Sequence, residues 1–346
     1  MANFTLEDVR QRTYKARDAW WTVILVDPLA SRLVRVTANR TSITPNQLTV
    51  GALVLGLGAG ACFVVASWPF LLLGALLYHL SFTLDCMDGK IARLKGTGSV
   101  FGAWLDYIFD RVRVLACAIA LMAGQYAATG NVAYIWTAVA VVFLDMLRYM
   151  DALEIYKVRS QMRNKLRAMR AEADALEQAS RRAEDGFAVD MNAELRSAED
   201  VLRPDPEADM DERVVADNPA VVLQAEFNKR FPWYARIRNA LQRSRIRPHL
   251  FSGIEFQMAV FIVAPVLDAA VPGAIIPVTV VAGAGLMAFE LAIIYQFWLS
   301  SRDYSRTMAK LEATVADFRG TLPPDAPEGE PAPHGAREAA VGGNGA

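Results

Sequence analysis

Four aspartates have a spacing that places them on two helix faces. Asp85 and Asp88 are three residues apart, and Asp106 and Asp110 are four apart, so each pair lies on one side of a helix, one turn apart. The Gly96-Thr97-Gly98 segment between the pairs is typical of a helix break. Two helices joined by so short a turn can face each other with their carboxylates converging. Ligands that are all oxygen favour Mg²⁺ or Mn²⁺ over Zn²⁺.

Small residues on the same helix faces leave space beside these carboxylates. Gly89 and Ala92 continue the face of the first pair, and Gly102 begins the face of the second. Such small side chains allow a ligand to approach the helix closely. Arg93, one turn after Gly89, can add a charge-assisted hydrogen bond to a phosphate. The pattern therefore favours a metal-bound diphosphate as the ligand.

The full spacing, D-x2-D-G-x2-A-R-x8-G-x3-D-x3-D, resembles the signature of the CDP-alcohol phosphotransferase (phosphatidyltransferase) family, with every fixed position filled. Eight such positions coincide by chance about once in 10⁹ starting points. The alternative is that the aspartates merely pair with nearby Lys and Arg side chains. A second, weaker resemblance is the opening Pro45-Asn46-Gln47-Leu48-Thr49, in which Asn46 either shapes the nucleotide pocket or belongs to a helix start signal.

The resemblance implies an enzyme of phospholipid biosynthesis. It would transfer a substituted phosphoryl group, most often phosphatidyl, from a CDP-alcohol such as CDP-diacylglycerol to a hydroxyl acceptor, and release CMP. Two divalent ions, Mg²⁺ or Mn²⁺, would be held by Asp85, Asp88 and Asp106, while Asp110 would act as the general base and also touch a metal. The residues implied for CDP binding are Asp85, Gly89, Ala92, Arg93, Gly102 and Asn46. Family analogy also implies a homodimer.

The acceptor would bind elsewhere in the site. A phosphate on the acceptor needs cations, for which Arg148, Arg245 and Arg247 are candidates, and Glu255 could bond an acceptor hydroxyl. The alternative roles are anchors at the membrane interface for the arginines and a partner of one of them for Glu255. Some family members instead move a polar head group from a CDP-linked alcohol to a lipid or soluble alcohol, and that reaction remains the alternative.

Long apolar runs indicate the elements that position these residues. The sequence predicts an all-α polytopic membrane protein with six transmembrane helices, each able to cross a hydrocarbon layer about 30 Å thick. The expected spans are roughly 47–67, 70–94, 100–122, 132–152, 254–271 and 273–298. The three cysteines have no paired spacing, which argues against a disulfide framework or a zinc site. Basic residues flank the spans instead of building a groove, so no nucleic-acid partner is expected.

The positive residues predict the orientation in the bilayer. The turns near Ser67, Gly124–Asn131 and Pro272 contain no Lys or Arg, whereas the other connections are rich in them. By the positive-inside rule, both termini and the aspartates lie on the cytoplasmic side. The short loops fit a plasma (inner) membrane.

The remaining segments are expected to lie outside the bilayer. Residues 1–45 form a cytoplasmic segment with one amphipathic helix over 4–40 on the membrane surface. Residues 46–152 hold the first four spans, 153–250 a cytoplasmic helical insert, 251–300 the last two spans, and 301–346 a largely disordered tail.

The start of the insert has its own pattern. Ile155, Met162, Met169 and Leu176 follow a seven-residue spacing, which fits either a short dimeric coiled coil or, given charged residues at the companion positions, a solvated helix.

Two rival classes use membrane carboxylates without this chemistry. A transporter or ion pathway would place them near the midplane, often with an inverted repeat, whereas these four gather at one interface and no inverted repeat is evident. An inactive scaffold would not need the intact set of aspartates. Both classes are therefore less favoured than the enzyme.

Overall fold

The computed structural model describes residues 3–183, 245–247 and 252–321, and these residues form helices with no strand among them. The chain divides into two units, Met1–Lys157 with Pro204–Trp298, and Val158–Arg203 with Leu299–Ala346. The part of the expected insert beyond residue 183 lies outside the described residues, apart from 245–247. The tail beyond residue 321 also lies outside them.

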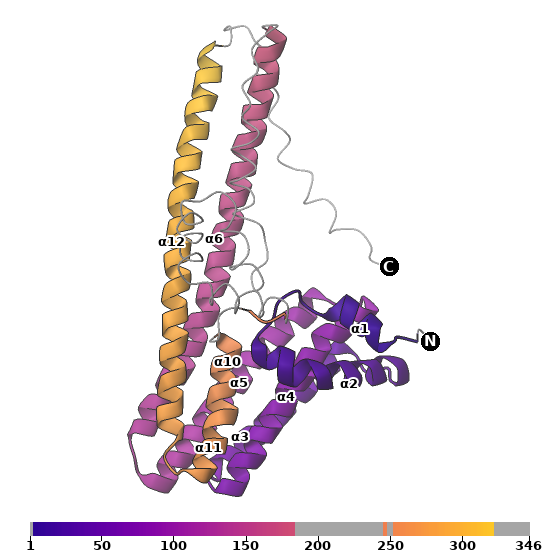
Figure 1. The fold of residues 1–346 in the computed structure, drawn as a ribbon, viewed down its shortest axis with the longest axis vertical. Helices are drawn as coiled ribbons and strands as arrows, with labels where there is room; N and C mark the ends of the chain where they lie inside the picture. The colour runs from indigo at the N-terminus through magenta and orange to yellow at the C-terminus, as the bar shows by residue number, and fades with distance from the viewer. Residues whose placement is uncertain (1–2, 184–244, 248–251, 322–346) are drawn as a thin grey trace, which may run out of the picture. The chain divides into compact units, whose positions relative to one another are not determined.

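Six helices of the described chain are long and apolar enough to cross a membrane, which confirms the expected all-α, six-span architecture. They are α3 (Pro45–Val64), α4 (Trp68–Lys95), α5 (Val100–Thr129), α6 (Ala133–Ala183), the α10–α11 helix with its π-helical middle η2 (Gly253–Met258, Ala259–Val263, Ala264–Ala270), and α12 (Ile275–Thr321). α3, α4 and α5 lie side by side (Figure 1).

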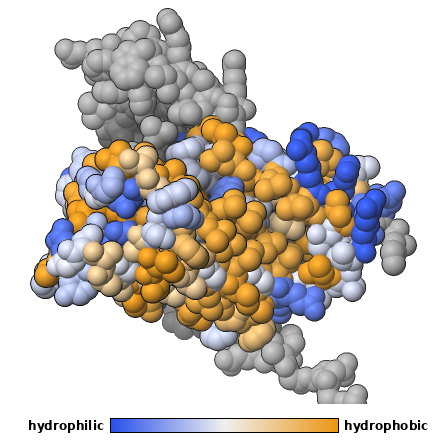
Figure 2. Space-filling view, turned by 90° about the horizontal axis from the view of Figure 1, so that it is seen from below, coloured by the Kyte–Doolittle hydropathy of each residue, from blue (hydrophilic) through white to orange (hydrophobic). Residues whose placement is uncertain are grey.

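The core of the first unit lies between these helices. Its largest fully buried side chains include Phe63, Tyr78, Leu121, Phe256 and Leu286, from five different helices. Outward-facing positions are also apolar, as a lipid-facing surface requires. Seen from below, hydrophobic residues cover most of the centre of the molecule and hydrophilic ones lie toward the edges (Figure 2).

The turn that joins α4 to α5 follows the predicted helix break. Gly96 ends α4 in the left-handed conformation, with φ 67°, which glycine adopts without strain. Ser99 then begins α5 as its N-cap, since its hydroxyl accepts a hydrogen bond from the Gly102 amide. Three residues, Thr97–Ser99, therefore separate Gly96 from the first residue of α5. One tight turn joins the end of α4 to the start of α5, the two helices that carry the aspartates.

The N-terminal segment is not the single helix expected over 4–40. It forms α1 (Leu6–Thr13), an extended stretch, and then a helix made of the π-helical η1 (Thr22–Val26) and α2 (Asp27–Arg40). Thr5 and Asp8 form a capping box at the start of α1, and the Thr5 hydroxyl and amide hold the pKa of Asp8 below its ordinary value.

Tertiary pairing explains the interruption. The Asp18 amide donates to the Arg245 carbonyl and the Asp18 carbonyl accepts from the Arg247 amide, which makes a parallel bridge between Asp18 and Ile246. These backbone groups would otherwise bond within a continuous helix. The partners are more than two hundred residues away, so local periodicity could not reveal the break.

Both π-helical turns stand just before a proline. The Asp27 amide bonds to the Thr22 carbonyl ahead of Pro28, and the Ala264 amide bonds to the Ala259 carbonyl ahead of Pro265. Proline lacks an amide hydrogen and its ring clashes with the carbonyl four residues earlier. A wider turn at the preceding residues relieves that clash without ending the helix.

The second unit contains the far ends of α6 and α12. Leu166 and Leu311 are buried there, with Met162, Met169, Tyr304 and Met308 packed around them, and Arg319 pairs with Glu172. The residues of α6 that repeat every seven positions therefore pack against α12 of the same chain. This is neither the dimeric coiled coil nor the solvated helix that the sequence predicts. Residues 301–321, which we assigned to a largely disordered tail, continue α12 because they supply the other side of this contact.

Candidate metal and diphosphate site

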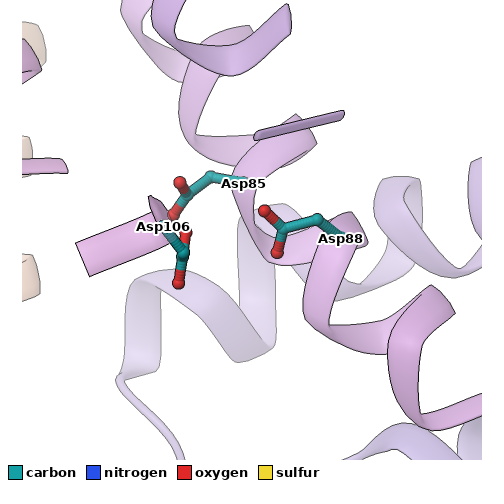
Figure 3. Close-up of side chains that lie close together, drawn as sticks. All are labelled: Asp85, Asp88 and Asp106. Carbon is teal, nitrogen blue, oxygen red and sulfur yellow. The ribbon is translucent and has the colours of Figure 1, made fainter. Parts of the chain in front are cut away.

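Three of the four motif aspartates converge. Asp85 and Asp88 on α4 and Asp106 on α5 each offer one carboxylate oxygen, and these oxygens all lie within 4.8 Å of one another. Figure 3 shows the three side chains directed toward the same space from two helices. The convergence follows from the predicted helix faces and the tight turn between α4 and α5.

The chemistry of this trio fits a hard divalent cation. All of its donors are carboxylate oxygens, which suit Mg²⁺ or Mn²⁺. Asp106 Oδ1 is buried without a hydrogen-bond partner, and Asp88 is only 6% exposed. Buried carboxylate oxygens are costly unless they are paired or bind a metal. The residues present therefore fit the ions that the sequence predicted.

Asp88 receives a hydrogen bond that the sequence analysis did not anticipate. Thr49 on α3 donates its hydroxyl to Asp88 Oδ2 at 2.5 Å, and both side chains are buried. This bond fixes one carboxylate oxygen and leaves the other for a ligand. The signal was present, because Thr49 ends the Pro-Asn-x-Leu-Thr segment, but the segment alone does not say which aspartate it meets.

Arg113 braces the fourth aspartate against the first. Its side chain is 3.2 Å from Asp85 Oδ1 and 3.3 Å from Ser81 Oγ, and it also pairs with Asp110 Oδ1. Gly56 makes room for it, since a Cβ there would lie 2.6 Å from the Arg113 side chain. Asp110 is therefore held beside the trio by an arginine instead of lying within it. Arg113 follows Asp110 by three residues and so lies on the same face of α5, but the sequence gives no sign of its contact with Gly56.

The other residues predicted for CDP binding lie on α4 and α5, which carry the trio, and at the start of α3. A Cβ on Gly102 would lie 2.7 Å from Asn46 Oδ1, so the start of α3 meets the start of α5. The Arg93 guanidinium extends back over Gly89, within 3.6 Å of the position that a Cβ would take. A Cβ on Gly98 in the turn would lie 3.8 Å from Ala92 Cβ. This arrangement leaves small residues and one exposed arginine beside the carboxylates.

Two of the four acceptor candidates are engaged in other contacts. Glu255 Oε2 caps α10 through Ser252, and its Oε1 accepts from the Trp20 amide at 3.2 Å. Arg245 lies 3.3 Å from Asp27 and stacks over the Tyr14 ring at 4.1 Å. Both residues connect the N-terminal segment to the chain around α10, a role that only the long-range pairing could disclose.

The other two acceptor candidates keep unused hydrogen-bond donors. Arg148 Nε lies 3.0 Å from Glu290, but Arg148 Nη1 is buried without a hydrogen-bond partner. Arg247 is 8% exposed, and its Nε and Nη2 are buried without partners. Buried guanidinium donors without partners are costly, and an anionic ligand would satisfy them.

Comparison with known proteins finds a family that is similar to the region around the site. Residues 42–170 match the CDP-alcohol phosphatidyltransferase family. A phosphatidylinositol phosphate synthase from Corynebacterium glutamicum is 34% identical over 89 residues, which are 26% of this chain and 37% of that protein. A bifunctional IPC transferase and DIPP synthase from Aquifex aeolicus is 41% identical over 70 residues, 20% of this chain and 15% of that protein.

An archaetidylinositol phosphate synthase from Pyrococcus horikoshii is 35% identical over 80 residues, 22% of this chain and 39% of that protein. The chain spans less than two fifths of the length of each of these relatives. The matched region, residues 42–170, nevertheless contains the entire signature together with Asn46, Thr49 and Arg113. Residues 42–170 of this chain are therefore similar to the CDP-alcohol phosphatidyltransferase family, and they include the carboxylate trio.

Proposed function

We propose that the protein transfers a substituted phosphoryl group, most simply phosphatidyl from CDP-diacylglycerol, to a hydroxyl acceptor with release of CMP. The observation that carries this proposal is the convergence of Asp85, Asp88 and Asp106 inside the matched domain. A diphosphate carries concentrated negative charge, and a carboxylate trio can receive it only with divalent cations between them. The donor then lies where small residues leave room.

Each motif residue has a role in this reaction. Asp85, Asp88 and Asp106 would hold two Mg²⁺ or Mn²⁺ ions, with Asp110 beside them. Such ions would neutralise charge on the diphosphate and on the leaving CMP. Arg93 binds a phosphate oxygen, and Asn46, Gly89, Ala92 and Gly102 border the nucleotide.

The transfer step needs a group that accepts a proton. Asp110 Oδ1 accepts a hydrogen bond from Arg113, and Oδ2, which lies 3.9 Å from Arg111 Nη2, can still accept a bond from the acceptor hydroxyl. The acceptor oxygen forms a bond to phosphorus, the bond from phosphorus to the CMP oxygen breaks, and the hydroxyl proton passes to Asp110 and then to solvent. Arg113 orients Asp110 for that transfer.

We assign an anionic acceptor, of which an inositol phosphate is the first choice. Two of the relatives are named for inositol phosphate products. In this chain, Arg247 and Arg148 carry the buried, unused donors that a phosphate would satisfy. Arg245 and Glu255 are not assigned to the acceptor site, because both already bind residues of the N-terminal segment.

The reaction would take place at the cytoplasmic face of a plasma membrane, as the distribution of Lys and Arg favours. A homodimer remains part of this proposal through the family resemblance, and chemical cross-linking in membranes would test it.

The test is CMP release by detergent-purified protein with Mg²⁺ or Mn²⁺ and CDP-diacylglycerol. Inositol 1-phosphate, glycerol 3-phosphate, inositol and serine are compared as acceptors. We expect release that depends on a phosphorylated acceptor, and Arg247→Gln should raise the KM for that acceptor about tenfold or more. Release with inositol alone would contradict the anionic acceptor, and no release with any acceptor or CDP-linked donor would contradict the transferase assignment.

A further inference from the structure

A buried ion cluster lies on the side of α4 that faces away from the carboxylates. Lys90 follows Asp88 by two residues, so its side chain leaves the helix about 200° around the axis from Asp88 at about 100° per residue. Lys90 Nζ lies 2.9 Å from Asp27 Oδ1 at the start of α2. Lys90 is 5% exposed and Asp27 is 3% exposed. The helix that carries Asp85 and Asp88 is therefore held on its opposite face by a buried ion pair.

A second cation shares Asp27. Arg245 Nη1 lies 3.3 Å from Asp27 Oδ2, and Arg245 Nε and Nη2 bond to the Lys15 carbonyl at 3.2 and 2.9 Å. The Tyr14 ring lies beneath the Arg245 guanidinium, and its hydroxyl bonds with Ser31 of α2. Asp27 thus joins three separated parts of the chain: α2, α4 and the segment 245–247.

The position of Asp27 is itself fixed. It is the residue at which the π-helical turn η1 gives way to α2, directly before Pro28. A side chain anchored at such a turn has little freedom to follow a moving partner. A buried charge that loses its partner is costly, so Lys90 and Asp27 are expected to stay in contact. An apolar contact would tolerate rotation of α4 that this pair does not.

We infer that Asp27 is a positioning residue for the carboxylate trio, a conclusion that rests on the proposed metal-dependent function. Through Lys90 it holds the end of α4 in the rotation that aims Asp85 and Asp88 at Asp106. Through Arg245 it also connects α4 to the segment 245–247, which precedes α10. The cluster acts on divalent-ion binding without touching the ion.

The test uses Lys90→Met in the full chain, because Asp27 then keeps Arg245 as a partner and no buried cation is left alone. Mn²⁺ binding to the detergent-purified protein is measured from the electron paramagnetic resonance signal of free Mn²⁺. We expect the dissociation constant to rise about tenfold or more, the usual effect of losing a group that orients a ligand. Lys90→Arg, which can still pair with Asp27, should bind Mn²⁺ within about threefold of wild type.

A matched control separates positioning from general stability. Asp268→Asn removes another buried carboxylate, which accepts from the Gly273 and Ile275 amides at the far end of α11. It should lower the unfolding temperature and leave Mn²⁺ binding unchanged. CMP release should distinguish the two variants in the same way. Lys90→Met should need a higher Mn²⁺ concentration for its half-maximal rate, and it should recover most of kcat when Mn²⁺ is saturating.

Normal Mn²⁺ binding by folded Lys90→Met would overturn the inference, and so would equal weakening in Asp268→Asn. If wild type binds Mn²⁺ and Lys90→Met binds it weakly, yet neither releases CMP with any donor, the positioning role stands and the proposed transfer reaction fails. If wild type releases CMP and Lys90→Met shows the same Mn²⁺ dependence, the reaction stands and the positioning role fails.

Discussion

The two ends of the same helices are built in opposite ways. At the end with the aspartates, α4 and α5 bury charges on several sides, among them Asp88, Lys90 and Arg113. At the other end the turns 65–67, 130–132 and 271–274 carry no Lys or Arg, and Trp68 and Trp136 are 64% and 70% exposed. One end is held mainly by ion pairs and hydrogen bonds, and the other mainly by close apolar and backbone packing.

Close backbone packing holds the uncharged end. A Cβ on Gly124 of α5 would lie 2.5 Å from the Phe63 carbonyl oxygen and 2.7 Å from the Val64 carbonyl oxygen of α3. A Cβ on Gly74 of α4 would lie equally close, 2.5 Å, to the Phe63 ring. Buried like charges are costly, whereas close packing stabilises. We therefore expect activity and stability to depend on opposite ends of the same three helices, so substitutions should separate them.

The largest expected effect is at Asp88. Asp88→Asn removes a proposed ion ligand, so CMP release should fall by about a hundredfold or more, while the unfolding temperature without divalent ions should not fall, because the trio loses one buried like charge. Rates and thermal unfolding of the purified protein are measured together. Asp268→Asn, the same change at the other end, should show the reverse. Near-normal turnover in Asp88→Asn would break the comparison.

A smaller effect is expected at Thr49, whose hydroxyl bonds to Asp88. Thr49→Val keeps the shape and removes the donor, which should weaken Mn²⁺ binding about tenfold. Thr49→Ser keeps the hydroxyl and should bind Mn²⁺ nearly as wild type does. The measurement is the Mn²⁺ titration described above. Equal losses in the two variants would mean that packing, and not the hydrogen bond, positions Asp88.

The smallest effect on activity is expected at Gly124. Gly124→Ala forces a Cβ against the α3 backbone and should lower the free energy of unfolding by about 1–3 kcal/mol. The rate of the folded enzyme at low temperature should stay within about twofold of wild type. Gly58→Ala is the control, because a Cβ there meets only Leu77 at an ordinary 3.8 Å. Unchanged thermal stability in Gly124→Ala would contradict the assignment of stability to this end.

Local patterns gave the spans, the break at Gly96 and the facing aspartates, because each depends on helix periodicity and on glycine over a few residues. They did not give the division of the N-terminal segment, since Asp18 pairs with backbone groups of Arg245 and Arg247. The joining of the α6 and α12 ends was missed for the same reason: one helix face shows that a partner is needed, but not which partner.

The acceptor candidates show the same limit of local information. All four were chosen for charge and place in the chain. Glu255 and Arg245 found partners in the N-terminal segment, whereas Arg247 and Arg148 kept unused donors. Charge can be read from composition. Whether that charge is already neutralised depends on contacts between residues far apart in the chain.

The sequence by itself determined the six membrane helices, the carboxylate signature and the chemistry it favours, because helix periodicity, apolar length and ligand type are local properties. Only the tertiary structure decided that Asp110 is braced by Arg113 beside Gly56, that Thr49 holds Asp88, and that Asp27 grips α4 through Lys90. These contacts join different helices, and buried charges select partners by distance in space.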